Sequence, residues 1–464
     1  MTLRNVVKSL LVVMTIVCLG ACSESYPGLD FDHTQGHDGI TNQDSWSEKT
    51  PIMVFVNEQD IFTVKTRGLG AFETDDTAKA ARLENSTFYV FAFRDGHYTQ
   101  SSIPALKEPT DFKWYFNATN GPAGYFDNDQ ATCLLDGTDF NKGLPLYLRP
   151  KGQGLLHTSK EGDEEPEFFY SSVHQQVPFN FFSYYIDDIV PSQVIRDKTG
   201  ISLKMEIDGS QDVMCGAAPN LLDEIRKGKK DNVWSVLSAD EKRTIENIGG
   251  YCAFAAHRGL HPMINMTHQL TQLKFEAYPG DESSNNITIT GISVESKYKG
   301  ALMVAANDVE NVGFKFDEDR KNLALRDSAD GKTNLPPLKE YKVEYKDEWK
   351  DIKWYNRPKV SIGSSLLLAP DSAFVLTIHY KEWLKQTIDD SRPQEVERTL
   401  HYTLNPPRTE LSKSSDGGYW FAPGVVYPIQ IAIYGSQAFE IYANIEGWKQ
   451  SDEAITIDDP DQGW

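Results

Sequence analysis

The chain has 464 residues, a formal net charge of −21 at pH 7, and 23 Phe, 21 Tyr and 9 Trp beside 33 Gly and 23 Pro. This negative charge argues against binding to nucleic acid and against direct binding to anionic lipid surfaces. A chain of this length exceeds one ordinary hydrophobic core and suits two or three domains. Aromatic segments punctuated by turn residues favour an all-β protein.

Residues 1–21 have the pattern of a lipoprotein signal peptide. A short positive region precedes an apolar run from Leu10 to Leu19, which is too short to span a bilayer and has the length of a signal-peptide core. The tetrapeptide leucine-glycine-alanine-cysteine that ends at Cys22 resembles the bacterial lipobox. That resemblance implies cleavage before Cys22 and lipidation of its thiol, so we expect an exported protein anchored in the outer membrane by lipid. The alternative is an ordinary secretory signal with a chance cysteine.

Residues 22–50 are polar and acidic, which predicts a flexible tether. Residues 51–215 follow as a predicted N-terminal β-sandwich. Segment 179–185 is so aromatic that we expect burial on both of its faces, and the apolar residues of 201–207 alternate onto one face. The strand candidates are 52–56, 61–64, 87–93, 111–117, 143–148, 177–186 and 201–207.

In residues 216–262 the pattern changes from that of strands to that of helices, which predicts a helical connector, or insert, between two β-domains. Ser238 followed by Glu241 forms a capping-box pattern that opens a helix, and Gly249 would end that helix. We interpret the segment as an excursion and not as a domain of its own.

Residues 263–464 predict a C-terminal β-sandwich. In residues 286–295 apolar and polar residues alternate regularly except at Gly291, which interrupts the pattern as a β-bulge would. Residues 317–357 are charged and loop-rich, which indicates a surface insertion. The strand candidates are 269–278, 286–295, 360–368, 374–380, 400–404, 425–434 and 439–445, and the last two predict a hairpin.

Cysteines are sparse after the signal peptide. Cys133, Cys215 and Cys252 remain beside the lipidated Cys22, and none has zinc-ligand spacing. One disulfide among the three is compatible with export, but the pattern favours three buried free thiols. The sequence predicts no metal ion and no cofactor.

The sequence lacks three motifs that mark common classes of enzyme. No G-x-S-x-G, H-E-x-x-H or P-loop pattern occurs. Ser296 and Lys299 satisfy an S-x-x-K pattern, yet they follow a strand pattern where such enzymes have a helix. We therefore predict that the chain is not an enzyme.

Eight segments that follow one another along the chain share a pattern: 25–30, 66–68, 88–93, 212–215, 268–275, 421–427, 441–448 and 455–457. Together they resemble the fimbrillin family of Bacteroidales, the FimA-like pilin lipoproteins. The resemblance spans nearly all of the chain after the signal peptide. The chain departs from the family at the helical segment 216–262, where relatives connect their domains more directly, and this leaves the subunit's place in a pilus open.

The resemblance implies two tandem transthyretin-like β-sandwiches and assembly into a fimbria. Such pilins are exported as lipoproteins and cut after an arginine, which removes a first strand and opens a groove for a strand of another subunit. Arg67, followed by Gly68, is the best match for the cut, Arg82 is the alternative, and absence of cleavage is the third reading. The donor strand matches the C-terminal stretch Ala454, Ile455, Thr456 and Ile457, which could equally be the last strand of its own sheet.

Two functions follow as hypotheses. The first is a structural or accessory fimbrial subunit that supports adhesion and biofilm, with other pilin subunits and a host or bacterial surface receptor as partners. The second is a surface lipoprotein that does not polymerise and binds glycans. Its candidate stacking residues, which core packing would also explain, are Trp114, Tyr115, Trp354 and Tyr355.

Overall fold

The computed structural model describes residues 50–56, 86–94, 133–135, 142–148, 155–158, 168–170, 175–187, 189–197, 199–306, 308–327, 335–384, 394–435 and 439–443. All of these residues belong to one compact unit that begins at Lys49. Several predicted features lie outside the described residues, among them the signal peptide, the tether and the predicted strands 61–64 and 111–117. The predicted site residues outside them are Cys22, Arg67, Gly68, Arg82, Trp114, Tyr115, Ala454, Ile455, Thr456 and Ile457.

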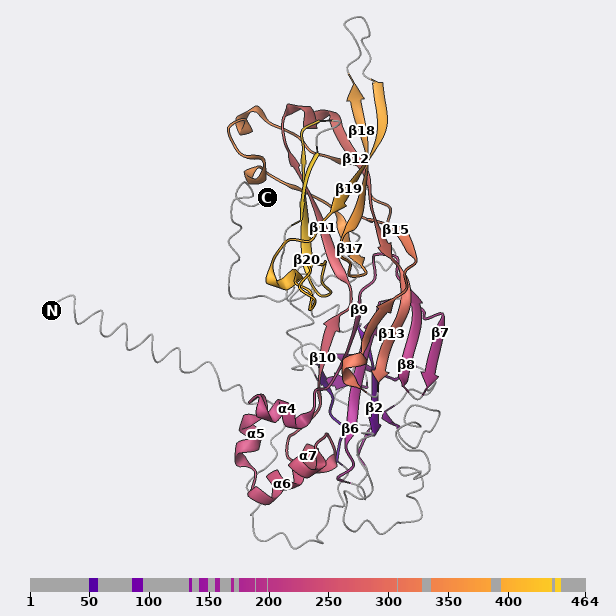
Figure 1. Cartoon of the computed structure of the whole chain (residues 1–464), viewed down its shortest axis with the longest axis vertical. Coiled ribbons are helices and arrows are strands. Elements are labelled where there is room, and N and C mark those ends of the chain that lie inside the picture. The colour runs from indigo at the N-terminus through magenta and orange to yellow at the C-terminus, as the bar shows by residue number, and fades with distance from the viewer. Residues whose placement is uncertain are drawn as a thin grey trace, which may run out of the picture. The chain divides into compact units, whose positions relative to one another are not determined.

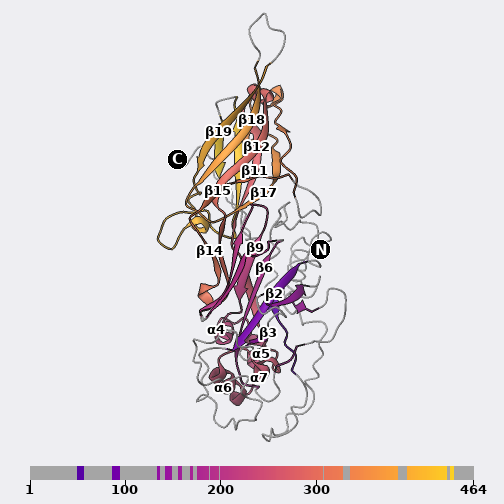
Figure 2. The same cartoon turned by 90° about the vertical axis from the view of Figure 1, so that its right-hand side faces the viewer.

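The first sheet has eight strands in the order β1-β10-β9-β6-β2-β4-β5, with β3 paired to β2. Strand β6 is buried on both faces from Phe181 to Tyr184, as its aromatic sequence predicts. Figure 2 shows β2, β6 and β9 side by side, in keeping with their pairing. The strands are β1 (Phe55–Val56), β2 (Thr87–Arg94), β3 (Cys133–Leu135), β4 (Leu144–Leu148), β5 (Leu156–His157), β6 (Phe179–Ile186), β9 (Val213–Ala217) and β10 (Met263–His268).

A second sheet, in the order β14-β13-β8-β7, covers one face of the first. Alternating residues of β8 point into the space between the two sheets, as predicted, and pack against phenylalanines of β2 and β6. This pairing of apolar faces builds the first sandwich. The strands are β7 (Gln193–Asp197), β8 (Gly200–Glu206), β13 (Lys299–Ala306) and β14 (Gly313–Phe316).

Helices cover the opposite face of the first sheet (Figure 1). The predicted capping box is confirmed, because the Ser238 hydroxyl accepts from the backbone N–H of Glu241 while the Glu241 carboxylate accepts from the N–H of Ser238. Gly249 ends that helix with a left-handed backbone, φ 76°. The segment predicted as a connector is thus a third layer. Its helices are α4 (Leu221–Arg226), α5 (Asp231–Val236), α6 (Ala239–Ile248) and α7 (Ala253–Ala256).

The C-terminal part forms a second sandwich from sheets in the orders β17-β11-β20-β21 and β15-β12-β18-β19, with β16 paired to β12. The predicted irregularity at Gly291 is confirmed as a register shift between β12 and β18, and the predicted hairpin is β20 with β21. The strands are β11 (Thr271–Pro279), β12 (Ile287–Lys297), β15 (Arg320–Ala324), β16 (Tyr341–Lys342), β17 (Val360–Leu368), β18 (Phe374–Leu384), β19 (Gln394–Leu404), β20 (Val426–Ile433) and β21 (Phe439–Ala443).

Strand pairing does not divide cleanly at residue 263, where the sequence places the start of the second sandwich. Strand β10 pairs with β9 and β1 of the first sheet. Strands β12 and β13 follow each other through Tyr298, and β14 and β15 return alongside them as a long hairpin, here called the ribbon. One end of the ribbon, β12 and β15, belongs to the second sandwich, and the other end, β13 and β14, belongs to the first. The architecture is all-β with packed sheets, as predicted, and the two sandwiches share this ribbon and one continuous apolar core.

Short 3-10 helices connect several strands: η5 (Glu282–Asn286), η6 (Val309–Asn311), η7 (Asp347–Trp349), η8 (Trp354–Asn356) and η9 (Glu410–Ser412). Among the residues that the structure describes, no helix is both long enough and apolar enough to cross a bilayer.

Candidate functional site

Residues 50–56 form an extended segment that other parts of the chain hold on both sides. On one side, the Phe55 N–H donates to the Pro262 carbonyl at 3.0 Å, and β1 runs parallel to β10. On the other side, the Leu156 N–H donates to the Val54 carbonyl at 2.9 Å. Further bonds of 2.9 Å run from the Ile52 N–H to the Phe168 carbonyl and from the Tyr170 N–H to the Thr50 carbonyl.

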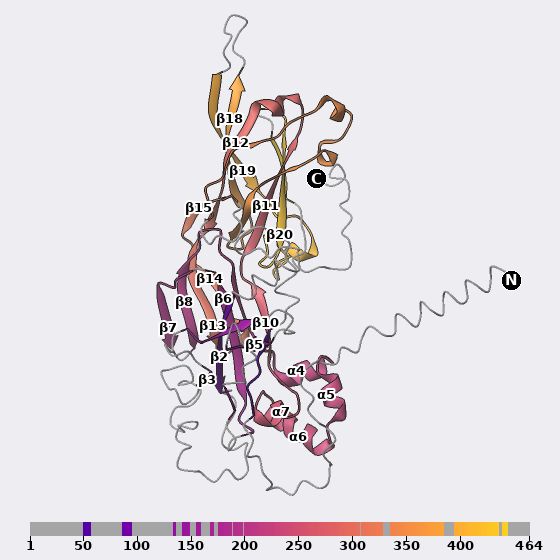
Figure 3. The same cartoon turned by 180° about the vertical axis from the view of Figure 1, so that it is seen from behind.

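These bonds close the first sheet on itself. Strand β1 stands at one end of the strand order and β5 at the other, yet Val54 and Phe55 contact Leu155 and Leu156 at the start of β5. In Figure 3, β5 is drawn next to β10, the strand with which β1 pairs. Removal of residues 50–56 would therefore leave two unpaired edges facing one gap.

The segment is buried as well as hydrogen-bonded. Val54, Phe55 and Val56 are 2%, 8% and 1% exposed, and the two valines belong to the cluster beneath the helical layer. Three such side chains contribute roughly 5–9 kcal/mol of gross burial free energy. The gap left by this segment would thus be an apolar groove flanked by unpaired backbone groups.

Two histidines that follow α7 contact this segment. The hydroxyl of buried Thr50 and Nε2 of His257 form a hydrogen bond. The ring of His261 lies beside the Phe55 ring, with 6.0 Å between centroids. Burial, and then the nearby Lys230 ammonium, lowers the pKa of His261 to about 4. The His261 side chain is therefore neutral at pH 7.

A second polar feature is a buried pair where the chain passes between the sandwiches. Nδ1 of His268 lies 2.8 Å from a carboxylate oxygen of Asp212, and both side chains are buried. The Asp212 N–H donates to Asp187 at 2.8 Å. Neither residue was predicted to form this pair. The local signal in the sequence is one ionisable residue at an end of each apolar strand, Asp212 just before β9 and His268 as the last residue of β10.

The two described residues proposed for sugar stacking, Trp354 and Tyr355, lie together on η8. The Trp354 indole stacks on Tyr442 of β21, with ring centroids 5.5 Å apart, and meets Tyr278 edge-on at 5.2 Å. Tyr355 packs edge-on against Trp354 at 5.6 Å. Through these contacts Trp354 packs the charged segment 317–357 against β11 and β21.

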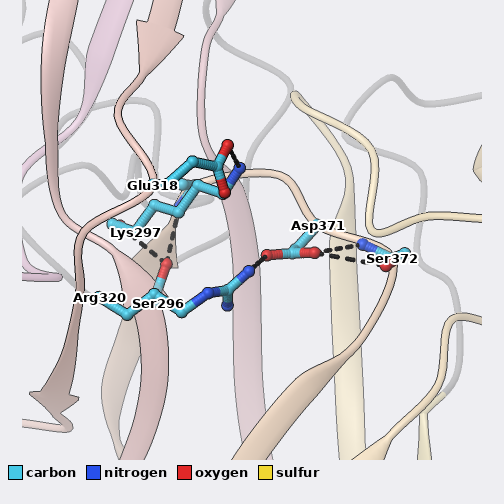
Figure 4. Close-up of polar contacts among 7 residues, drawn as sticks. Ser296, Lys297, Glu318, Arg320, Asp371 and Ser372 are labelled. Atoms are coloured by element: carbon cyan, nitrogen blue, oxygen red, sulfur yellow. Dashed lines mark hydrogen bonds and ion pairs between the residues drawn. The ribbon is translucent and has the colours of Figure 1, made fainter.

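Ser296 and Lys299, the S-x-x-K residues, lie on the ribbon and take part in structural contacts. Figure 4 shows Ser296 with its neighbour Lys297. Ser296 of β12 is buried, and its hydroxyl accepts from the Ala369 N–H at 3.2 Å and donates to the Lys297 carbonyl at 2.9 Å. Lys297 pairs with Glu318 at 2.8 Å, and Lys299 pairs with Asp319 at 2.7 Å.

Figure 4 also shows a second link, in which Arg320 of β15 lies 2.6 Å from Asp371 between β17 and β18. Asp371 in turn accepts from the Ser372 N–H at 2.7 Å. These contacts bind the ribbon to the second sandwich.

Cys215 and Cys252 are free thiols and buried, as predicted, whereas the side chain of Cys133 lies outside the described residues. Burial raises the pKa of both thiols, that of Cys252 to about 12. Both are therefore protonated and unreactive at neutral pH. Within the described part of the chain, no group of three or more His, Cys, Asp or Glu residues could hold a metal ion.

No family model matches the chain, and no curated protein sequence is similar to it. Solved structures of candidate cell adhesion proteins from Bacteroides are weakly similar. The protein from Bacteroides ovatus ATCC 8483 has a TM-score of 0.37 and 10% identity, over 86% of this chain and 98% of that one. The protein from Bacteroides eggerthii DSM 20697 has a TM-score of 0.34 and 9% identity, over 86% and 96%. The protein from Bacteroides fragilis NCTC 9343 has a TM-score of 0.25 and 8% identity, over 88% and 100%.

Proposed function

We propose that this chain is a subunit of a surface fimbria, assembled by strand exchange after proteolytic removal of its N-terminal strand. The observation that carries the proposal is the position of residues 50–56. Thr50 and residues 54–56 are buried, segments distant in sequence hydrogen-bond the strand on both sides, and the strand precedes Arg67. A cut after Arg67 separates this strand covalently from the remainder of its sheet.

A strand from another subunit fits the chemistry of the vacated groove. The edges beside β10 and β5 require backbone donors and acceptors, and the positions of Val54 and Val56 require apolar side chains two residues apart. In the C-terminal stretch, Ile455 and Ile457 have this spacing. We propose that they are donated to a neighbouring copy, while the intact N-terminal strand blocks the groove before cleavage.

The proposal places the precursor in the outer membrane through lipid on Cys22, and the processed protein in a fimbrium that supports adhesion and biofilm. Its partners are other pilin subunits and a surface receptor. We assign the chain no catalytic residue, cofactor or metal ion.

The decisive experiment is brief treatment of the purified precursor with an arginine-specific protease, followed by N-terminal sequencing and electron microscopy. We expect a new N-terminus at Gly68 and the appearance of filaments. Arg67→Ala should prevent both, whereas Arg82→Ala should prevent neither. A processed protein that has lost its N-terminal fragment and stays monomeric at high concentration would overturn the proposal.

The donor segment and the anchor need separate tests. Deletion of residues 449–464 should abolish filaments and leave the far-ultraviolet circular dichroism of the monomer unchanged. Cys22→Ser should abolish incorporation of labelled palmitate and shift the protein out of the membrane fraction. Filaments formed by the truncated chain would exclude the C-terminal stretch as donor.

A further inference from the structure

We propose that the helical layer clamps residues 50–56 in the first sheet, so that cleavage of the following chain does not by itself release them. The layer is defined by α4–α7 and the residues that lead into β10. The inference rests on the proposed strand release and deepens it by identifying what controls that release. Three sets of contacts carry it.

The first contact holds the start of the strand. The Thr50 hydroxyl bonds to His257, the residue that directly follows α7, across 207 positions of sequence. The backbone carbonyl of Thr50 accepts from Tyr170 on the other side. Thr50 is therefore fixed through its side chain by the helical layer and through its backbone by Tyr170, in the segment between β5 and β6.

The second contact holds the end of the strand. The Phe55 ring lies beside the His261 ring, and the Phe55 N–H donates to the adjacent Pro262 carbonyl. The Lys230 ammonium, before α5, donates to the His261 carbonyl at 3.3 Å, so the turn that meets Phe55 is itself tied to the helices.

The third set makes the clamp rigid. The Arg258 guanidinium donates to the Glu241 carboxylate at 3.0 Å and to the Phe254 carbonyl at 2.8 Å, and it lies 3.6 Å from the centre of the Phe254 ring. Because Arg258 directly follows His257, these contacts join the clamp to α6. The Phe254 N–H donates to Gln175 at 2.8 Å, which joins α7 to the segment before β6.

These contacts differ in kind from those of the sheet. Any strand that enters the groove can form the backbone bonds to β10 and to Leu156, because they need no particular side chain. The bond to His257 requires the Thr50 hydroxyl, and the contact with His261 requires an aromatic or similarly large residue at Phe55. The clamp therefore favours the chain's own strand over a replacement and slows the exchange.

The test uses the full-length chain with the recognition sequence of a specific protease introduced between residues 66 and 69. After cleavage, size-exclusion chromatography at successive times measures how much N-terminal fragment stays bound. We expect slow release from the parent chain and roughly threefold to tenfold faster release from Thr50→Val and from His257→Ala, the range for one hydrogen bond. His379→Ala, which alters a histidine of β18 far from the groove in sequence, is the matched control and should leave release unchanged.

A double-mutant cycle makes the test specific. Because Thr50→Val and His257→Ala remove the same bond, the double variant should release the fragment no faster than the faster single variant. Fragment that leaves the parent chain as fast as the variants, or effects that add fully, would overturn the clamp. The readout is independent of polymerisation: a chain that loses its fragment and still forms no filaments contradicts the proposed function, whereas a fragment lost at once, followed by filaments, supports the proposed function and overturns the clamp.

Discussion

Asp212 and His268 form a buried pair, 2.8 Å apart, at the crossing between the two sandwiches. Asp212 leads into β9 and His268 ends β10, from which the chain continues to β11 of the second sandwich, so the pair joins two neighbouring strands where the chain leaves the first sandwich. Removing one partner of such a pair leaves an ionisable group buried without compensation.

The first prediction concerns this pair. Asp212→Ala should lower the free energy of unfolding by about 3–5 kcal/mol, because His268 would lose its buried partner. Urea denaturation monitored by circular dichroism measures the change. As the control, Arg243→Ala breaks the exposed pair with Asp240 on α6 and should change stability by less than about 1 kcal/mol. Equal effects of the two substitutions would contradict the role assigned to Asp212.

The second prediction is a pH dependence that comes from His261. Its pKa is about 4 in the folded protein and about 6.5 when unfolded, so between these values the unfolded state binds the extra proton. Stability should fall as pH drops from 6.5 to 4, by up to about 3 kcal/mol from this group. His261→Phe keeps an aromatic ring beside Phe55 and should flatten this part of the profile. The measurement is urea unfolding at pH 7 and pH 4.5, and an unchanged difference between the two would refute the assignment.

The third prediction uses Gly216, where β9 meets β10. A Cβ added there would lie 2.0 Å from the backbone oxygen of Asn265, so an alanine must push the two strands apart. We expect Gly216→Ala to destabilise the fold by at least about 1–3 kcal/mol. Gly418→Ala is the matched control, because the nearest atom to its added Cβ is the Asp416 carboxylate at 3.4 Å. Thermal unfolding should separate the two variants clearly.

The fourth prediction assigns a structural role to Ser296. Its hydroxyl accepts from the Ala369 N–H in a buried place, so Ser296→Ala leaves that N–H without this acceptor. The loss should be about 1–3 kcal/mol in the free energy of unfolding. Ser293→Ala, at a half-buried position of the same strand, should change stability by less than about 0.5 kcal/mol. A neutral Ser296→Ala would show that the ribbon does not depend on this bond.

Local patterns in the sequence predicted local structure well. Ser238 and Glu241 lie three residues apart and form their capping box within one turn, so no distant residue is needed. The alternation of Ile201, Leu203 and Met205 likewise reports directly which face is buried. Such features depend on neighbours in sequence, and they were confirmed.

Features that depend on distant partners escaped prediction. Strand β19 was expected only at 400–404, because its first half is polar and exposed, and pairing with β18 alone makes it a strand. Strand β15 falls inside the predicted loop 317–357 for the same reason, since Arg320, Lys321 and Asn322 are exposed. Thr50 and His257 are separated by 207 positions, and nothing near either residue in the sequence points to the other.

The shared ribbon has a consequence for the order in which the chain acquires its structure. Strands β10, β13 and β14 complete the first two sheets, yet the earliest of them begins only at Met263 and the last ends at Phe316. The two sheets of the first sandwich therefore lack strands during synthesis until about three hundred residues have been made. The first sandwich therefore cannot fold to completion before part of the second has been synthesised. We expect the incomplete chain to need protection from self-association until β13 and β14 are present.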